Sequence, residues 1–380
     1  MKIESIEISV FELPMYPAAF SVVDGGSTPE TRWRRGFLDG IRSDVPVQVI
    51  RVITDEGVEG VCTVGDWQHT EMSWQRLAQL RALAIGEDPL DRERLWSKLS
   101  SVARFFEPAW FGGFDNCLWD IAGKVAGIPV AKLLGDARPR ARAYFNTAGS
   151  TPEALIEDGA AALEAGFDVL KDHAVFGFEE NMQVFRQFRE AYGDDVGLMH
   201  DAAGINYSYD QAVQMGRLLE ELNFIWLEEP LEDDRDHADY VKLCETLDIP
   251  IAGAETLMHD PKLGALWLET GACDILRVNA RHGTTGLLQL AKFAQERNGN
   301  VEPNTYGPLF GLVHAHVVCG IENIDWFEGK PPEGGAEMGE AIGLLNPVRP
   351  ENGHVTYPDT PGWGAEWDWK YFEKKRVAVL

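Results

Sequence analysis

The sequence lacks paired cysteines, a long apolar run and an excess of positive charge. Its five cysteines are widely spaced in apolar contexts without a CxxC pair, which indicates buried thiols in a reducing cytoplasm rather than zinc or redox sites. No run approaches the ~18 apolar residues of a membrane-spanning helix, and no signal peptide is visible. The net charge of −27 disfavours nucleic acid and anionic membranes as partners. We therefore expect a cytoplasmic protein that acts on a small molecule.

The first third of the chain has the pattern of an α+β domain. The opening MKIESIEISVFELP alternates apolar and polar residues as a strand does, and a hairpin with the turn DEG follows. Helical periodicity then extends from about residue 71 to 135. Between the strand and the hairpin, the Gly- and Pro-bearing stretch from Ser21 to Ser43 predicts a long loop. We assign residues 1–135 to this domain and expect the Pro-, Gly- and Trp-rich segment 347–380 to pack back on it.

Residues 136–346 alternate strand and helix patterns at an interval of about 23 to 30 residues. The candidate strands are ARAYFNTA, FDVLKDH, VGLMHDA, FIWLEEP, IPIAGAE, DILRVN, NVEPN and IDWFEG. Eight strands in this rhythm predict an α/β fold class, with a β/α barrel over residues 136–346.

Three carboxylates stand at one fixed interval. Asp201, Glu228 and Glu255 follow each other at 27 residues, each at the end of a predicted strand. The carboxyl ends of barrel strands meet at the catalytic face, so we expect the three acids to lie together. Because an all-oxygen pocket suits a hard divalent cation, the sequence predicts an Mg²⁺ site.

Further polar residues share the inward face of the barrel strands. Lys171 and His173 on strand two are candidates for the base that removes a proton, and Glu328, a fourth acid on strand eight, is a further catalytic candidate. Asn279 and Asn304 on strands six and seven are candidates for orienting substrate hydroxyls. Plainer roles stay open: an ion-pair partner for Lys171, a core position for His173, and a pair with a barrel lysine for Glu328.

Other polar residues near the strand ends have structural interpretations. His200 should point outward into the helix layer and make a structural hydrogen bond, and Arg277 and Glu302 could form a buried pair. His282 could reach the mouth of the barrel, and the segment HGTTG that begins there could hold an anion on its backbone amides.

The stretch from Ser21 to Ser43 contains three arginines around a tryptophan. Arg34 and Arg35, with Trp33, could close over the mouth and contact the distal end of a carboxylate substrate, because arginine binds carboxylates through a planar fork. The alternative is a solvated surface cluster.

Several of these motifs resemble the enolase superfamily, in the branch typified by mandelate racemase and the acid-sugar dehydratases. The resemblance rests on MKIESIEI, TDEGVEG, CLWDIAGKVAGIPVAKLLG, HDAAG, LEEP and GAET. It implies an α+β capping domain, a modified (β/α)₇β barrel, and Mg²⁺ on Asp201, Glu228 and Glu255. It also implies abstraction of the proton next to a carboxylate, through an enediolate. We further expect a homo-oligomer and a small-molecule carboxylate substrate.

The catalytic residues depart from the pattern of that branch. The usual Lys-x-Lys of strand two is Lys171-Asp172-His173, and Asn279 and Asn304 stand where a catalytic Asp and His are typical. Because an amide does not move protons at neutral pH, only one face of the substrate is clearly equipped for proton transfer. This favours dehydration of an acid sugar, an aldonate or aldarate, to a 2-keto-3-deoxy acid.

The alternatives are a racemase or epimerase, a sugar-lactone cycloisomerase, or a metal-binding barrel without activity. Efficient racemisation would require an unrecognised acid on the second face, such as Tyr306 or His282. Tyr306 is also a candidate for substrate contact.

Overall fold

The computed structural model describes most of the chain. The described residues are 1–15, 18–23, 32–37, 43–65, 71–103, 111–174, 176–203, 205, 207–231, 237–255, 257, 260–304, 307–329 and 335–380. The side chains of 14, 15, 18–23, 32–37, 43–46 and 103 are outside this description.

The capping part of the chain is an antiparallel sheet covered by helices. Strand β1 (Ile3–Met15) pairs with β4 (Ser43–Thr54), which pairs with β5 (Glu59–Thr63). Alternation in β1 places the buried Ile6 and Ile8 on one face of the sheet and the buried Phe11 and Leu13 on the other. The helices are α1 (Trp74–Ala84), α2 (Arg92–Ala103), α3 (Gly112–Ala126) and α4 (Val130–Leu134).

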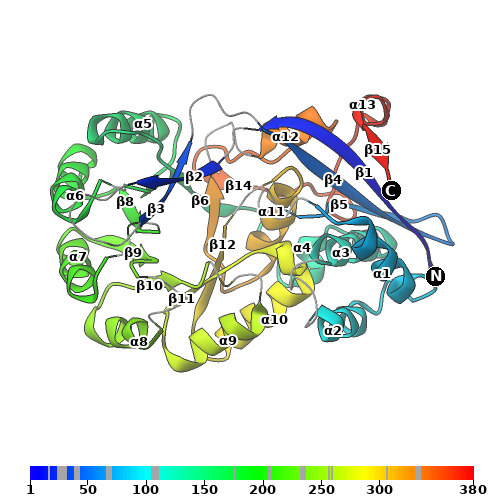
Figure 1. The fold of residues 1–380 in the computed structure, drawn as a ribbon, viewed down its shortest axis with the longest axis horizontal. Helices are drawn as coiled ribbons and strands as arrows, with labels where there is room; N and C mark the ends of the chain where they lie inside the picture. Colours follow the sequence, from blue (N-terminus) through cyan, green and yellow to red (C-terminus); the bar gives the residue numbers. More distant parts are fainter. Residues whose placement is uncertain are drawn as a thin grey trace.

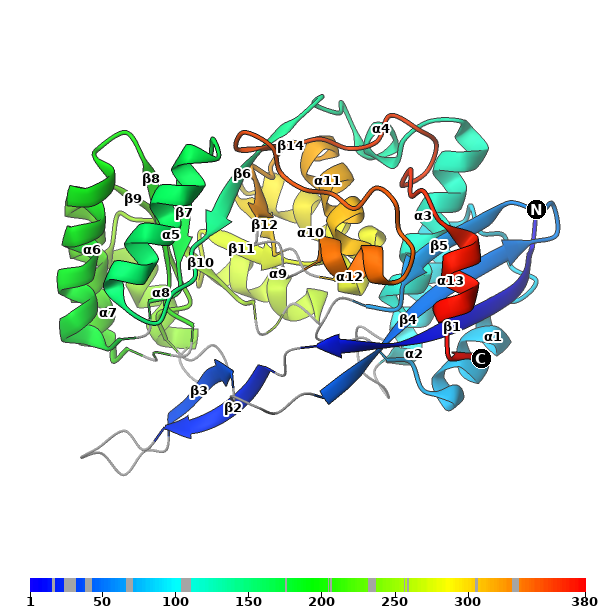
Figure 2. The same cartoon turned by 90° about the horizontal axis from the view of Figure 1, so that it is seen from above.

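A second hairpin corrects the expectation of a long loop from Ser21 to Ser43. Strand β2 (Ala18–Val23) pairs antiparallel with β3 (Arg32–Phe37), and Trp33 stands opposite Val22. The Gly and Pro residues that suggested a loop are concentrated between the two strands, whereas AAFSVV and RWRRGF favour extended backbone. The hairpin projects beyond β1 and β4, on the side of the barrel toward which β6 points (Figure 2).

The predicted barrel strands are confirmed. The described residues form eight parallel strands in the order β12, β11, β10, β9, β8, β7, β6, β13. In chain order they are β6 (Ala141–Asn146), β7 (Val169–Asp172), β8 (Gly197–Asp201), β9 (Phe224–Glu228), β10 (Ile251–Gly253), β11 (Ile275–Val278), β12 (Asn300–Pro303) and β13 (Trp326–Gly329).

One helix follows each of the first seven strands, which is the (β/α)₇β arrangement. They are α5 (Pro152–Glu164), α6 (Phe178–Tyr192), α7 (Tyr209–Glu221), α8 (His237–Thr246), α9 (Pro261–Thr270), α10 (Thr284–Gln295) and α11 (Phe310–Gly320). Figure 1 shows α5 to α9 on the outside of the strands, with the capping sheet at the other end of the molecule.

Glu302 connects β12 and β13, the first and last strands in this order. Its carboxylate accepts the backbone N–H groups of Asp325 (3.0 Å) and Trp326 (2.9 Å), at the start of β13. The suggested ion pair between Arg277 and Glu302 is therefore wrong, because Arg277 contacts Glu228 and Glu328 instead. Burial raises the pKa of Glu302 to about 8.

The last part of the chain contacts both the barrel and the capping sheet. Helix α12 (Ala336–Ala341) precedes β14 (His354–Val355), which pairs with β6. Helix α13 (Trp369–Lys375) leads to β15 (Ala378–Val379) on the edge of β1. No helix among the described residues has the length and apolarity to span a membrane.

The start of α3 packs against the start of α10, shortly after β11. The carboxylate of Asp115 accepts the backbone N–H (2.9 Å) and the hydroxyl (2.8 Å) of Thr285, and Asn116 Oδ1 accepts the same two groups of Thr284 (2.9 and 2.8 Å). The HGTTG amides of residues 284 and 285 are thus occupied by the capping part, which corrects the suggestion of an anion site. Gly112 permits this contact, since a Cβ there would lie 1.8 Å from the carbonyl oxygen of Arg281.

Candidate active site

The three evenly spaced acids converge at the carboxyl ends of adjacent strands. Asp201 ends β8, Glu228 ends β9, and Glu255 follows β10. Their ligand oxygens lie within 4.8 Å of one another, and Asp201 and Glu228 are buried. The equal sequence interval therefore corresponds to one cluster in space.

Glu255 is positioned by a neighbour that the sequence analysis did not single out. Ala254 adopts a left-handed φ of 67°, which turns the chain just after β10. The N–H of Glu255 then donates to Glu229 Oε1 at 2.6 Å. The sequence signal for this positioning role of Glu229 was its place in the LEEP motif, directly after the candidate ligand Glu228 at the end of a strand.

Two cationic side chains share the site with the acids. Lys171 Nζ lies 2.9 Å from Asp201 Oδ2 and 2.8 Å from Glu228 Oε2. Arg277 Nε lies 2.8 Å from Glu228 Oε1, and the same side chain reaches Glu328 Oε2 at 3.0 Å. Burial alone would lower the pKa of Lys171, but Asp201 and Glu228 raise it well above its usual value. In this arrangement Lys171 is a cation.

The donor set fits Mg²⁺. Burial raises the pKa of Glu228 to about 8, and the adjacent carboxylates of Asp201 and Glu255 act in the same direction against Arg277 and Lys171. A divalent cation among these oxygens would favour the ionised form. All three candidate ligands offer carboxylate oxygens, which are the donors that Mg²⁺ prefers.

His173 lies at the edge of this cluster. Its Nε2 is 3.1 Å from Asp201 Oδ2, the oxygen that Lys171 also contacts, and its side chain is 39% exposed. Of the two candidate bases at the end of β7, His173 is therefore the one accessible to solvent, while Lys171 is 1% exposed.

Glu328 on β13 contacts Asn146, the last residue of β6. Asn146 Nδ2 donates to Glu328 Oε1 at 2.6 Å, while Arg277 holds the other carboxylate oxygen. The partners of Glu328 are thus an arginine and an amide, and not the lysine that the alternative interpretation suggested. The alternation of side chains along ARAYFNTA, the sequence of β6, was the signal that Asn146 lies on the inward face of the barrel.

The side-chain amides that follow β11 and β12 are hydrogen-bonded to each other and to one of the candidate metal ligands. Asn279 Nδ2 donates to Asn304 Oδ1, and Asn304 Nδ2 donates to Glu255 Oε1 at 2.8 Å. Both residues are buried. They therefore hold Glu255 in place within the structure.

The remaining candidates cannot all be placed. The backbone of Trp33, Arg34 and Arg35 lies on β3, but their side chains are outside the described part, and Tyr306 is outside it altogether. His282 is buried in the short 3₁₀ turn η1 (Ala280–His282) after β11.

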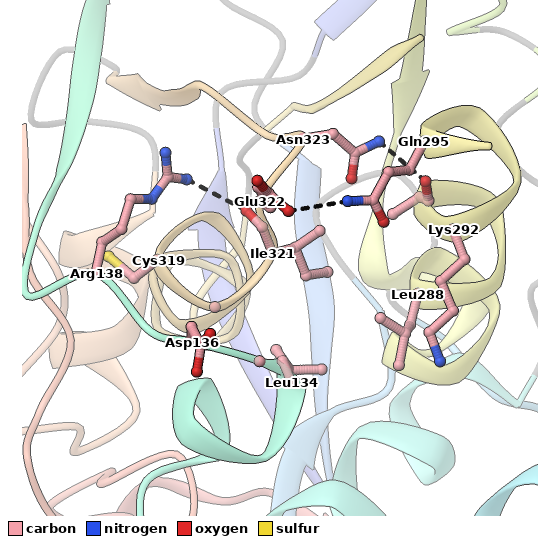
Figure 3. A pocket seen from close by; sticks show the side chains of 13 residues that line it. Leu134, Asp136, Arg138, Leu288, Lys292, Gln295, Cys319, Ile321, Glu322 and Asn323 are labelled. Carbon is pink, nitrogen blue, oxygen red and sulfur yellow. Dashed lines mark hydrogen bonds between the residues drawn. The ribbon is translucent and has the colours of Figure 1, made fainter. Parts of the chain in front are cut away.

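A separate cavity of about 390 Å³ lies away from the acids (Figure 3). Its lining residues precede β6, β12 and β13, so the cavity is at the amino ends of the strands. Arg138 on its wall donates to the carbonyl of Ile321 at 3.3 Å, and Gln295 donates to Glu322 at 3.0 Å. Catalytic residues of β/α barrels lie at the opposite ends.

Comparison with known proteins agrees with this geometry. Residues 39–135 match the mandelate racemase / muconate lactonizing enzyme N-terminal domain, and residues 154–371 match the enolase C-terminal domain-like family. The D-galactarolactone cycloisomerase of Agrobacterium fabrum is 30% identical over 304 residues, which cover 74% of this chain and 79% of that protein.

The arabinonate dehydratase of Saccharolobus solfataricus is 29% identical over 299 residues, which cover 75% of this chain and 78% of that protein. The crystal structure of D-glucarate dehydratase from Agrobacterium tumefaciens, complexed with magnesium, matches with a TM-score of 0.80 at 27% identity, over 99% of both chains. The chain is an enzyme of the mandelate racemase-like branch of the enolase superfamily.

Proposed function

We propose that this enzyme dehydrates an acid sugar, an aldonate or aldarate, to a 2-keto-3-deoxy acid with Mg²⁺ as cofactor. One observation carries the proposal: among the described residues, the groups able to move a proton, Lys171 and His173, lie at the end of β7. In the same part of the chain, the ends of β11 and β12 present to the cluster only amides and the guanidinium of Arg277, which does not give up its proton. Chemistry on one face of the substrate is sufficient for a syn elimination but not for racemisation. Relatives named arabinonate dehydratase and D-glucarate dehydratase support the substrate class.

Asp201, Glu228 and Glu255 would hold the metal. When bound, Mg²⁺ would bind the substrate carboxylate and stabilise the negative charge that develops there as the neighbouring carbon loses its proton. Asn304 keeps Glu255 oriented through its 2.8 Å hydrogen bond, and Asn279 orients Asn304. Direct contact of these amides with substrate hydroxyls stays a prediction.

His173 is the proposed base. Its Nε2 faces the metal ligands from the solvent side, where a substrate would enter, and an imidazole suits proton transfer near neutral pH. After taking the α-proton, the same nitrogen would deliver it to the departing β-hydroxyl on that face. Lys171 is the runner-up, and its ammonium would otherwise stabilise negative charge on the substrate carboxylate.

Glu328 is proposed to act through its neighbours. Buried under Arg277 and Asn146, it balances the charge of the guanidinium that also contacts Glu228. A direct catalytic role for Glu328 is a second hypothesis, which Glu328→Gln would test through the dehydration rate.

Cycloisomerisation of a sugar lactone is the second candidate, favoured by the 30% identity to the D-galactarolactone cycloisomerase. The two candidates differ in their products, because only dehydration releases a 2-keto acid from an open-chain acid sugar.

The deciding experiment is a screen of the purified protein with Mg²⁺ against aldonates, aldarates and their lactones. Semicarbazide trapping would read 2-keto acid formation, and NMR would follow lactone consumption. We expect dehydration of at least one acid sugar and none with the Glu228→Gln variant. Turnover of lactones alone would favour cycloisomerisation. Rapid racemisation of an α-hydroxy acid would refute the one-face argument.

A further inference from the structure

A buried hydrogen-bond network lies on the outer side of β7 and β8, behind the proposed base. Asp172 stands between Lys171 and His173, and His200 directly precedes Asp201. Alternation turns both side chains away from the metal ligands and toward the helix layer. There, His200 Nδ1 lies 2.9 Å from Asp172 Oδ1, and both residues are at most 4% exposed.

The network continues through Tyr207 and Asn181. The Nε2 of His200 is 3.3 Å from the Tyr207 hydroxyl, and Asn181 Nδ2 donates to that hydroxyl at 2.9 Å. For a neutral imidazole at His200, donors and acceptors match in one direction only. Asn181 donates to the Tyr207 oxygen, Tyr207 donates to Nε2, and the proton on Nδ1 of His200 faces the carboxylate of Asp172. Burial raises the pKa of Tyr207, which keeps its hydroxyl as a donor.

Both ends of this network fix the residue after the proposed base. Asp172 Oδ1 accepts the N–H of Ala174 at 2.8 Å, and Asn181 Nδ2 donates to the carbonyl oxygen of Ala174 at 2.7 Å. The backbone that follows His173 is therefore held on both of its polar groups. The ring of Phe185 packs on His200 with centroids 4.4 Å apart and leaves the imidazole little freedom.

We infer that His200, through Asp172, is a positioning residue that holds His173 against the metal site. His200 ties β8, which ends in Asp201, to the β7 end that carries His173, so it sets the 3.1 Å approach of His173 Nε2 to Asp201. The inference rests on the proposed function, in which His173 takes the α-proton. Displacement of a catalytic group by about 1 Å can cost roughly 100-fold in rate.

Two substitutions at residue 200 separate this role from simple packing. His200→Phe fills the space next to Phe185 but removes both polar contacts, whereas His200→Asn keeps a donor near the position of Nδ1. His316→Asn is the control, because His316 is also a buried histidine with two polar contacts, to Ala131 N (3.1 Å) and Trp363 O (3.1 Å), and neither partner belongs to the network around His200.

We expect His200→Phe to lower kcat and α-proton exchange about 10- to 100-fold, with KM and Mg²⁺ affinity near those of the wild type. His200→Asn should recover most of the loss. The control should lower the midpoint of thermal unfolding without changing exchange. Wild-type exchange in His200→Phe, or an equal loss in His316→Asn, would overturn the inference.

A readout without substrate keeps this inference distinct from the proposed function. In ¹⁵N-histidine NMR spectra, His200→Phe should shift the ring signals of His173, and His316→Asn should leave them in place. Unmoved His173 signals would overturn the positioning role. A wild-type protein that converts no acid sugar would instead overturn the proposed function, while the NMR result would still stand.

Discussion

Replacement of Asp115 by Asn should change how the stability of the protein depends on pH. Asp115 is buried where the capping part meets the start of α10. Burial raises the pKa of its carboxyl from 3.8 to about 7, against the hydrogen bonds from Thr285 and the charge of Arg92. The folded protein therefore binds a proton between about pH 4 and 7 that the unfolded chain releases. The contribution of Asp115 to the free energy of unfolding therefore falls as the pH rises through this range.

The size of the effect follows from the difference between the two pKa values. Each pKa unit corresponds to about 1.4 kcal/mol, so ionised Asp115 costs the folded state about 4 kcal/mol above pH 7. About 2–3 kcal/mol of this cost appears between pH 5 and pH 8. An asparagine keeps an acceptor for the Thr285 N–H but does not titrate.

Urea unfolding at pH 5 and pH 8, with EDTA present, would measure this difference. Relative to the wild type, Asp115→Asn should gain about 2–3 kcal/mol in unfolding free energy at pH 8 compared with pH 5. The control is Asn116→Ala, which disturbs the same contact with a residue that does not titrate and should act equally at both pH values. Parallel pH dependences for the wild type and Asp115→Asn would refute the reasoning.

Four further predictions concern the site. Glu228→Gln should abolish Mg²⁺ binding in calorimetry, and a crystal with Mg²⁺ far beyond ~2.0–2.1 Å from the three acids would contradict the ligand assignment. His173→Asn should stop exchange of the α-proton into deuterated water while Mg²⁺ affinity persists; unchanged exchange would exclude it as the base. Asn304→Ala should weaken Mg²⁺ binding about tenfold, because a metal ligand loses its hydrogen-bond donor, and undiminished affinity would argue against this support. Arg34→Ala should raise KM more for an aldarate than for an aldonate, and equal effects on both substrates would indicate that Arg34 belongs to a solvated surface cluster.

Local sequence determined the barrel strands and the grouping of the three candidate metal ligands. A strand reveals its inward face through a period of two, and a strand-helix unit of constant length returns each acid to the same edge of the sheet. Asp201, Glu228 and Glu255 could therefore be grouped without coordinates. The loop expected from Ser21 to Ser43 was wrong because an average over the stretch concealed two short strands around its Gly and Pro residues.

Only the tertiary structure decided which partner each buried charge takes. Alternation gives the direction of a side chain but not how far it reaches across a curled sheet, so Arg277 was expected beside Glu302 and instead contacts Glu228 and Glu328. The contact of Asp115 with Thr285 joins residues 170 positions apart, and no local pattern encodes such a distance. Burial then sets the pKa values of these groups, because desolvation depends on everything that packs around a charge.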